Sequence, residues 1–341
     1  MLRNIQSLGR GQRLLLFALV FAGGLLLIAL VTAVLVLGAL NTNPRTLAAP
    51  AAPEVTVREF AILPDDDAFP SGVAVGPDGV VYTASYKTGV VWAISPDGQV
   101  TEVPGTRDGL GAVSNLAVGP DGALYVVDKL DADVRASGGL VRRVTPGGQI
   151  TDFARITDER GFLLPHDLTF DRDGRLYVSD RGRDEVWRFE PDGSGGLVWW
   201  RSPVVEGARG YEPTGLAYDP ARDALLIADG GLDIIYRVAI ATGATETLYR
   251  HPGRDNAPGF DGLTVTPAGT VYAAALSQNG VARLDDGRLY YLATGFRGAS
   301  DVAFAAPNRL YVTNFEGFSL AFPVVAPRLP FALDLVELNA P

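Results

Sequence analysis

The sequence predicts an all-β protein, a six-bladed β-propeller of four-stranded blades, preceded by one N-terminal transmembrane helix. Three observations predict this fold. A strand–turn–strand unit recurs six times, one long uncharged apolar run precedes the repeats, and 40 Gly and 23 Pro residues are spread along the chain. Such a density of turn formers suits many short strands rather than long helices.

The N-terminal segment has the charge pattern of a membrane anchor. Residues 1–13 are a basic tail with three arginines, and residues 14–40 contain no charge, which is about 40 Å as a helix. The positive-inside rule predicts a cytoplasmic N-terminus and an extracytoplasmic propeller. A cleaved signal peptide is the alternative, but its apolar region is usually only about 7–15 residues long. Residues 41–54, rich in Pro and Ala, are expected to form a linker without periodicity.

The propeller is predicted over residues 55–341, where alternating apolar runs are separated by Gly, Asp and Pro turns. In all six units the second strand follows the same pattern, and its central residue recurs every 39 to 52 residues, at Tyr82, Tyr125, Tyr177, Leu226, Tyr272 and Tyr311. Third strands such as VVWAI and EVWRF follow, each with a Gly-containing turn and a fourth strand. Four strands at this period are typical of propeller blades. Two strand-like segments at the ends, Val55–Leu63 and Phe331–Leu338, are expected to share the last blade and close the ring.

Composition excludes several kinds of site. The chain has no Cys, which rules out disulfides, thiolate metal sites and cysteine nucleophiles. Its net charge of −10, with no basic block, does not favour nucleic acid as a partner. We find no G-x-S-x-G elbow, no P-loop and no H-E-x-x-H motif.

The repeats resemble those of the gluconolactonase and senescence-marker-protein superfamily, and more loosely NHL-repeat and strictosidine-synthase-like propellers. The match is clearest over FDGLTVTPAGTVYAAALSQNGVARLDDG, Phe260 to Gly287. The resemblance implies one divalent cation, calcium, magnesium or manganese, in the central channel, and a lactonase or esterase activity. By blade order the implied metal ligands are Ser71, His166, Thr214 and Asp261. Only Asp261 keeps the residue type of the family.

His166 is also the candidate catalytic residue, because an imidazole with an ordinary pKa near 6.5 suits proton transfer. The alternative is a structural histidine hydrogen-bonded at the ring centre. His166 and Asp261 begin equivalent strands two blades apart, so we expect them to converge on a cation or water without a direct hydrogen bond. An ionised Asp261 would then raise the pKa of His166.

Other acidic residues recur at fixed positions. Asp167 and Asp301 occupy the next position of the first strand and line the channel if the register slips by one residue. A structural role in capping turns is expected for the residues that end second strands, Asp128, Asp180, Asp229 and Asn314. The connection KLDADVRASGG, residues 129–139, is a candidate lid or contact loop.

Two functions fit these observations. The first is a membrane-anchored binding or accessory module at the outer membrane face, whose partner is another membrane-complex subunit or a small-molecule ligand. The second is a metal-dependent lactonase or esterase with its site in the central channel. A propeller fold does not decide between a binding protein and an enzyme, because it hosts both.

Overall fold

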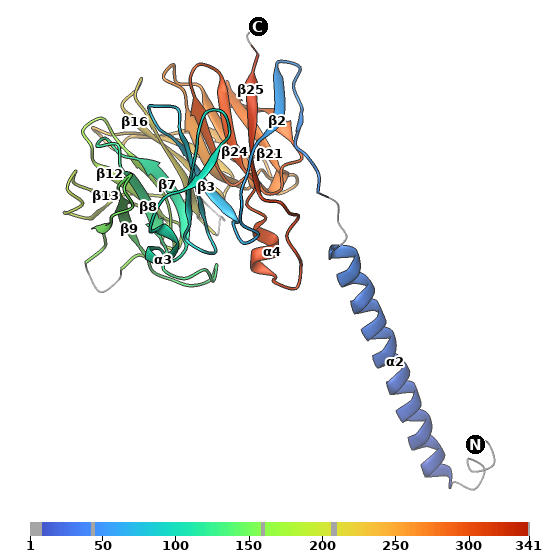
Figure 1. The fold of residues 1–341 in the computed structure, drawn as a ribbon. Coiled ribbons are helices and arrows are strands. Elements are labelled where there is room, and N and C mark those ends of the chain that lie inside the picture. The colour runs from blue at the N-terminus through green and yellow to red at the C-terminus, as the bar shows by residue number, and fades with distance from the viewer. Residues whose placement is uncertain (1–8, 42–44, 158–160, 206–209, 340–341) are drawn as a thin grey trace.

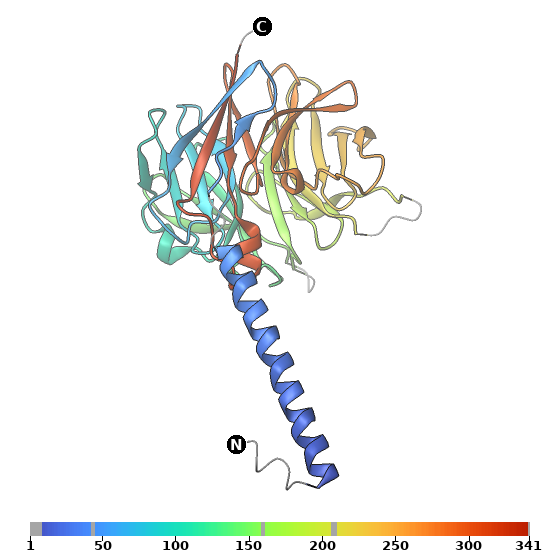
Figure 2. The same cartoon turned by 90° about the vertical axis from the view of Figure 1, so that its right-hand side faces the viewer.

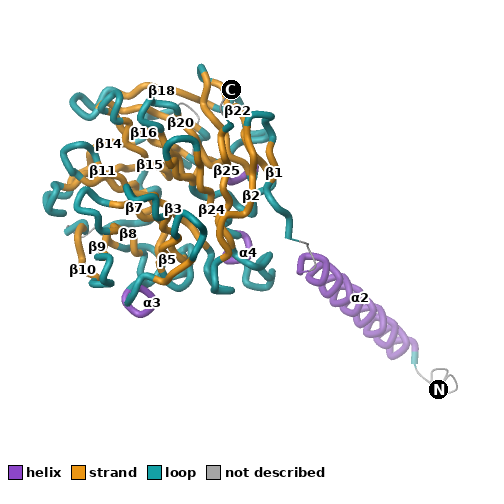
Figure 3. The backbone as a smooth tube through the Cα atoms, turned by 45° about the horizontal axis from the view of Figure 1, so that its top comes forward, coloured by secondary structure: helices purple, strands orange, loops and turns teal. Residues whose placement is uncertain are grey.

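Six antiparallel sheets surround a central axis in the computed structural model, which describes residues 9–41, 45–157, 161–205 and 210–339 (Figure 1). The first strands of successive blades contact one another around the axis, and the last contacts the first. Figure 3 shows the blades following one another around the ring. The predicted six-bladed propeller is confirmed.

Blades 1 to 4 are each formed by consecutive strands. From the axis outward, blade 1 contains β3 Pro70–Val75, β4 Val81–Ser85, β5 Val91–Ile94 and β6 Val100–Glu102, and blade 2 contains β7 Val113–Val118, β8 Leu124–Asp128, β9 Leu140–Val144 and β10 Ile150–Ala154. Blade 3 contains β11 Pro165–Phe170, β12 Leu176–Asp180, β13 Glu185–Phe189 and β14 Leu197–Arg201. Blade 4 contains β15 Pro213–Asp219, β16 Ala224–Asp229, β17 Ile234–Ala239 and β18 Thr245–Arg250.

Blades 5 and 6 each recruit a strand from the N-terminal side of the propeller. Blade 5 contains β19 Phe260–Val265, β20 Val271–Ala275, β21 Gly280–Asp285 and β22 Arg288–Thr294, with β1 Ala49–Pro50 added outside β22. Blade 6 contains β23 Val302–Ala305, β24 Arg309–Thr313 and β25 Ala332–Leu338, and β2 Val55–Ile62 is its outermost strand. The two terminal segments therefore share blade 6, as the sequence predicts.

The linker differs from the expected stalk. Ala49 and Pro50 pair with Thr294 and Ala293, and Ala52 is buried. Because β22 would otherwise expose an unpaired edge, these residues find backbone partners there. Only the first part of residues 41–54 is left to separate the propeller from the N-terminal helix α2, Arg10–Asn41.

The hydrophobic core lies between the blades. Six clusters of buried residues each join neighbouring sheets, and one example is the contact of Tyr125 in blade 2 with Phe170 in blade 3, ring centroids 4.8 Å apart. Large aromatic side chains fill the widening space between twisted sheets. This explains why aromatic residues recur at fixed positions in the repeats.

The propeller has two faces. One face is formed by the connections that precede the first strand and follow the second strand of each blade, and we call it the mouth face. This face carries the short helices α3, Thr106–Gly109, and α4, Gly317–Ala321, and the 3-10 turn η1, Leu276–Gln278. In Figure 1 α3 and α4 lie at the lower side of the propeller.

Candidate functional site

Two layers of side chains surround the axis where the first strands begin. The outer layer consists of Ser71, Ser114, His166, Thr214, Asp261 and Ser300, and the inner layer of Gly72, Asn115, Asp167, Gly215, Gly262 and Asp301. In blades 1 to 5 the register between first and second strands shifts at these positions. Such a bulge changes the direction of side chains, so two consecutive residues of one strand can both face the channel.

His166 and Asp261 lie close together in the outer layer. His166 Nε2 is 3.2 Å from Asp261 Oδ1, although the residues belong to blades 3 and 5. The side chains lie closer than expected, because the glycines of the inner layer let the strands approach closely, but the expected absence of a direct hydrogen bond holds among the described residues. A Cβ at Gly215, for example, would lie 2.2 Å from the Asp261 carbonyl oxygen. The contact lacks hydrogen-bond geometry, and neither Asp261 Oδ1 nor His166 Nδ1 has a hydrogen-bond partner among the described residues.

Burial dominates the protonation of this pair. It lowers the pKa of His166 to about 3, assisted by the positive charges of Arg181 and Lys129. Burial likewise raises the pKa of Asp261 to about 7, against the opposing charge of Arg181. The expectation that Asp261 raises the pKa of His166 is therefore wrong in direction. A carboxyl group that is itself protonated below about pH 7 offers no charge to hold an imidazolium.

The other two implied metal ligands turn toward the channel wall. Ser71 Oγ donates to the Ser114 carbonyl at 2.7 Å, and Thr214 Oγ1 lies 3.1 Å from the Phe260 carbonyl. Within the described ranges, no group of three or more His, Asp or Glu residues is arranged to hold a metal ion.

The positive charges near His166 and Asp261 also oppose a cation. The donor set therefore does not fit the divalent cation that the resemblance implies. The roles of Ser71, Thr214, His166 and Asp261 as ligands stay predictions.

The inner layer closes the channel. Asp301 accepts hydrogen bonds from the backbone N–H groups of Val302 and, across the ring closure, of Val73, both at 2.8 Å. Asp167 makes the same pair of contacts with Leu168 and Leu216, both at 2.7 Å. Burial raises the pKa of both carboxyl groups, that of Asp301 to about 7. Asp167 and Asp301 thus line the channel, as the alternative register predicts. Both also line a cavity of about 370 Å³ that lies toward the face opposite the mouth.

The residues that end second strands have the predicted structural role. Asp128 Oδ1 accepts from Leu130 at 2.8 Å, and Asp180 accepts from Leu163 and Leu164, both at 2.8 Å. Asp229 and Asn314 bind the connections beside them in the same way. These contacts fix the loops that form the mouth of the channel.

The position that follows the aligned end of each second strand, with Asn314 as that end in blade 6, lies at this mouth, and no sequence motif marks it. The residues at this position are Tyr86, Lys129, Arg181, Gly230, Leu276 and Phe315. Lys129 is almost fully buried, donates to Tyr86 Oη at 2.7 Å, and burial lowers its pKa to about 8. No hydrogen bond or ion pair joins the Arg181 guanidinium to another residue of the described chain. Alignment on the second strand would have revealed two consecutive blades with a cation at this position.

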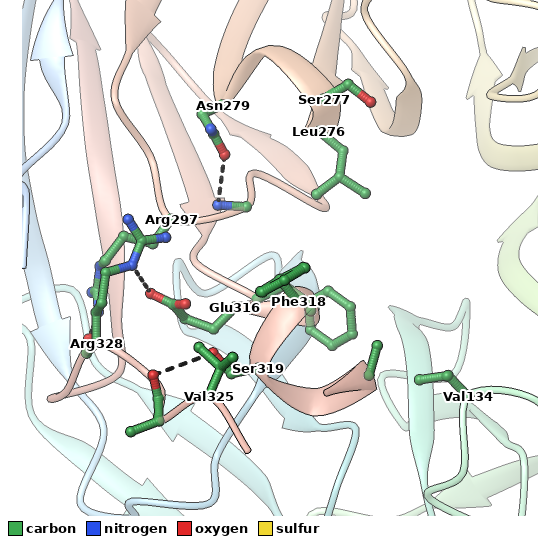
Figure 4. Close-up of a pocket in the computed structure, with 15 residues that line it drawn as sticks. Val134, Leu276, Ser277, Asn279, Arg297, Glu316, Phe318, Ser319, Val325 and Arg328 are labelled. Atoms are coloured by element: carbon green, nitrogen blue, oxygen red, sulfur yellow. Dashed lines mark hydrogen bonds and ion pairs between the residues drawn. The ribbon is translucent and has the colours of Figure 1, made fainter. Parts of the chain in front are cut away.

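A pocket of about 760 Å³ opens on the mouth face (Figure 4); Lys129 and Arg181 do not line it. Leu276, Phe315, Phe318 and Val325 contribute its apolar wall, and Val134 of the predicted contact loop lies across from them. The Phe315 ring lies 5.6 Å from the ring of Tyr86, which binds Lys129. The mouth therefore has a cationic half in blades 2 and 3 and an apolar half in blades 5 and 6.

The pocket rests on an ion pair whose carboxylate is buried and whose guanidinium is half-buried. Arg328 Nε donates to Glu316 Oε1 at 2.8 Å, and Arg297 donates to the Pro330 carbonyl at 3.0 Å. These contacts hold both ends of the segment that contains α4.

Comparison with known proteins agrees with this architecture. The model of the SMP-30/gluconolactonase/LRE-like region matches residues 120–316, more than half of the chain. A gluconolactonase from Xanthomonas campestris has 20% identity and a TM-score of 0.63, covering 87% of this chain and 99% of that one. Regucalcin from Agrobacterium tumefaciens, a calcium-binding protein, has 15% identity and a TM-score of 0.58, covering 82% and 96%. At these identities the two structures show the fold alone.

A curated mouse protein, peptidyl-glycine alpha-amidating monooxygenase, is 36% identical over 73 residues. The match covers 20% of this chain and only 8% of that protein.

Proposed function

The chain belongs to the SMP-30/gluconolactonase/LRE-like family, and from this premise we propose that it is a membrane-anchored, extracytoplasmic module that binds a small organic anion at the mouth of its propeller. The observation that carries the proposal is the guanidinium of Arg181, which makes no hydrogen bond or ion pair with the described residues, near the almost fully buried Lys129. Arg181 is partly buried, and an anionic ligand would give its guanidinium the charge-assisted hydrogen bonds that it does not make with the described residues.

The apolar half of the mouth determines which anions fit. A polar anion such as gluconate would leave Leu276 and Phe318 without a partner, whereas an alkyl chain would bury them. At about 760 Å³ the pocket is in the size range of small-molecule sites. We therefore expect a carboxylate with an apolar tail as the ligand class.

The anchor is the helix α2, whose candidate span, Arg10–Val36, contains an 18-residue window with a mean hydropathy of 3.0 and no buried residue. A soluble core helix would bury most of these side chains. With the basic tail on its N-terminal side, the positive-inside rule places the propeller outside the cytoplasm.

Calorimetric titration of the detergent-solubilised full chain with octanoate tests ligand binding. Arg181→Gln should weaken octanoate binding about 10- to 100-fold, since a charge-assisted hydrogen bond contributes about 1.5–3 kcal/mol. Arg143→Gln is the matched control, because Arg143 is paired with Asp121 on the opposite face. Gluconate should bind more weakly than octanoate. Equal octanoate affinity in wild type and Arg181→Gln would refute the proposal.

A second candidate function is hydrolysis of an ester or lactone, favoured by Asp261 Oδ1, which accepts no hydrogen bond from the described residues, and by the pKa near 7 of its carboxyl group. Such a carboxylate can act as general base at neutral pH. It would take a proton from water as the water oxygen attacks the acyl carbon, and would return the proton to the leaving alkoxide. The released carboxylate belongs to the same ligand class.

Hydrolysis is tested with an octanoate ester and an octanoic lactone. Asp261→Asn should abolish the activity while leaving octanoate affinity within about twofold. Asp286→Asn, at an exposed turn with positive φ, is the control. A wild type that binds octanoate but hydrolyses neither compound would leave a binding module only.

A further inference from the structure

The path of the chain between α2 and the propeller fixes which face of the propeller is near the anchor. Ala49 pairs with Thr294 at the end of β22, where the chain leaves blade 5 toward the mouth face. The Leu47 carbonyl lies 3.5 Å from the Cβ position of Gly295, one residue beyond β22. Arg45 is ion-paired with Glu59 of β2. The anchor therefore joins the propeller at its mouth face.

The connection to α2 is short. From the last helical residue, Asn41, to Arg45 there are four peptide steps, which span at most about 14 Å. In both ribbon views α4 lies at the end of the propeller from which the chain passes to α2 (Figures 1 and 2). With α2 in a bilayer, this length holds the mouth face of blades 5 and 6 within reach of the lipid headgroups.

Exposed apolar side chains are concentrated on the same face. Of the ten large hydrophobic residues exposed in the described propeller and linker, eight lie on the mouth face, namely Leu47, Ile62, Leu130, Val204, Phe318, Phe322, Val324 and Leu329. The other two, Leu197 and Tyr290, lie elsewhere. Phe318 and Val324 are 60% and 66% exposed, although water-facing loops usually carry polar residues at such positions.

We propose that the mouth face lies on the membrane surface, with residues 317–325 dipping into the lipid interface beside the anchor. This inference rests on the proposed function in that α2 must remain in the bilayer. Phe318, Phe322 and Val324 project from a segment whose ends are held by the Arg328–Glu316 pair, so their exposure is a fixed feature of the loop. Amphipathic segments with aromatic and aliphatic residues bind at this depth of a bilayer.

The same arrangement gives the pocket access to the membrane. Phe318 belongs both to the exposed loop and to the pocket wall (Figure 4). An amphiphilic carboxylate in the outer leaflet would therefore meet the apolar half of the mouth first, and its headgroup would meet Lys129 and Arg181.

The absence of Cys from the chain allows a direct test with single labels. The variants Phe318→Cys and Val324→Cys, and the control Gln99→Cys in the β5–β6 turn of the opposite face, are labelled with an environment-sensitive fluorophore. The full chain is incorporated into phosphatidylcholine nanodiscs, and emission is measured with nitroxide-labelled lipid and with aqueous iodide. All three positions are exposed, so the fold is retained; thermal melting verifies this.

We expect blue-shifted emission at positions 318 and 324, with lipid-borne nitroxide quenching several times stronger there than at position 99, and iodide quenching in the reverse order. Three labels that are equally quenched by iodide and unaffected by lipid nitroxide would overturn the inference. Shielding from iodide without nitroxide quenching would also overturn it, indicating a second copy of the chain instead of lipid. Failure of the chain to remain in nanodiscs after alkaline washing would refute the anchor itself, which separates the two failures.

Discussion

At the scale of single residues, the channel shows how burial can override charge. His166 and Asp261 contact each other, yet each is held in its neutral form around pH 6. Titratable groups with opposed pKa shifts in one cleft are a feature of functional sites. A purely structural pair would be expected to use Nδ1 of His166 and Oδ1 of Asp261 in hydrogen bonds, and both atoms lack partners among the described residues.

Asp261→Asn should stabilise the protein at alkaline pH. The folded-state pKa of Asp261, about 7, lies above the unfolded value of about 4. The stability that this carboxyl group contributes is therefore fully present below about pH 4 and is lost as the pH rises from there through 7. The variant removes this loss, which we place at about 1–3 kcal/mol at pH 8, below the full linkage value of about 4 kcal/mol.

Thermal melting of wild type and variant at pH 4 and pH 8 measures this effect. We expect a higher melting temperature for Asp261→Asn at pH 8 and nearly equal values at pH 4. Asp286→Asn, which removes an exposed carboxylate, should change neither. A destabilised variant at pH 8 would indicate that ionised Asp261 is held by favourable contacts.

The residues of the site could be predicted only in part. The repeat pattern located His166, Asp261, Asp167 and Asp301, because alternation and turn residues fix the start of each first strand. Their mutual distances depend on how closely six sheets approach the axis, which small residues such as Gly215 and Gly262 decide through packing. The mouth cations Lys129 and Arg181 carry no motif, and their convergence comes from the ring rather than from local sequence.

At the scale of elements, ring closure depends on β2. This strand pairs with β25 over seven residue pairs, from Val55 with Leu338 to Ile62 with Ala332. Its Phe60 packs against Tyr311 of β24, ring centroids 4.7 Å apart. The sequence predicted the shared blade because both terminal segments read as strands. It could not predict that β2 is outermost, nor that β1 pairs with β22, because two residues show no periodicity.

Phe60→Ala should destabilise the propeller by about 2–4 kcal/mol, because it opens a cavity at the closure and weakens the attachment of β2. Thr56→Ala, exposed on the same strand, should cost less than about 1 kcal/mol. Denaturant unfolding followed by tryptophan fluorescence compares the two variants, since all four tryptophans lie in the propeller. Equal free energies of unfolding for the two variants would show that β2 does not close the ring.

At the scale of the whole molecule, the short connection after α2, the exposed apolar residues and the channel mouth all lie on one face. The sequence predicts the anchor and the repeats separately, from different segments of the chain. These features share one face because β1 pairs with β22, which brings the residues that precede β1 to the mouth face. A linker without this pairing would not fix the direction from which the chain enters the propeller. In the proposed arrangement this pairing orients the propeller with its mouth toward the membrane.

The central claim, that the mouth binds an organic anion between a cationic and an apolar half, is tested most directly by crystallography. Crystals of the full chain with octanoate brominated at its terminal carbon would locate both ends of the ligand, the bromine by anomalous scattering. We predict the bromine in the pocket between Leu276 and Phe318, and the carboxylate in contact with Arg181 or Lys129. A bromine bound anywhere else, or a carboxylate pointing away from both cations, would contradict the account.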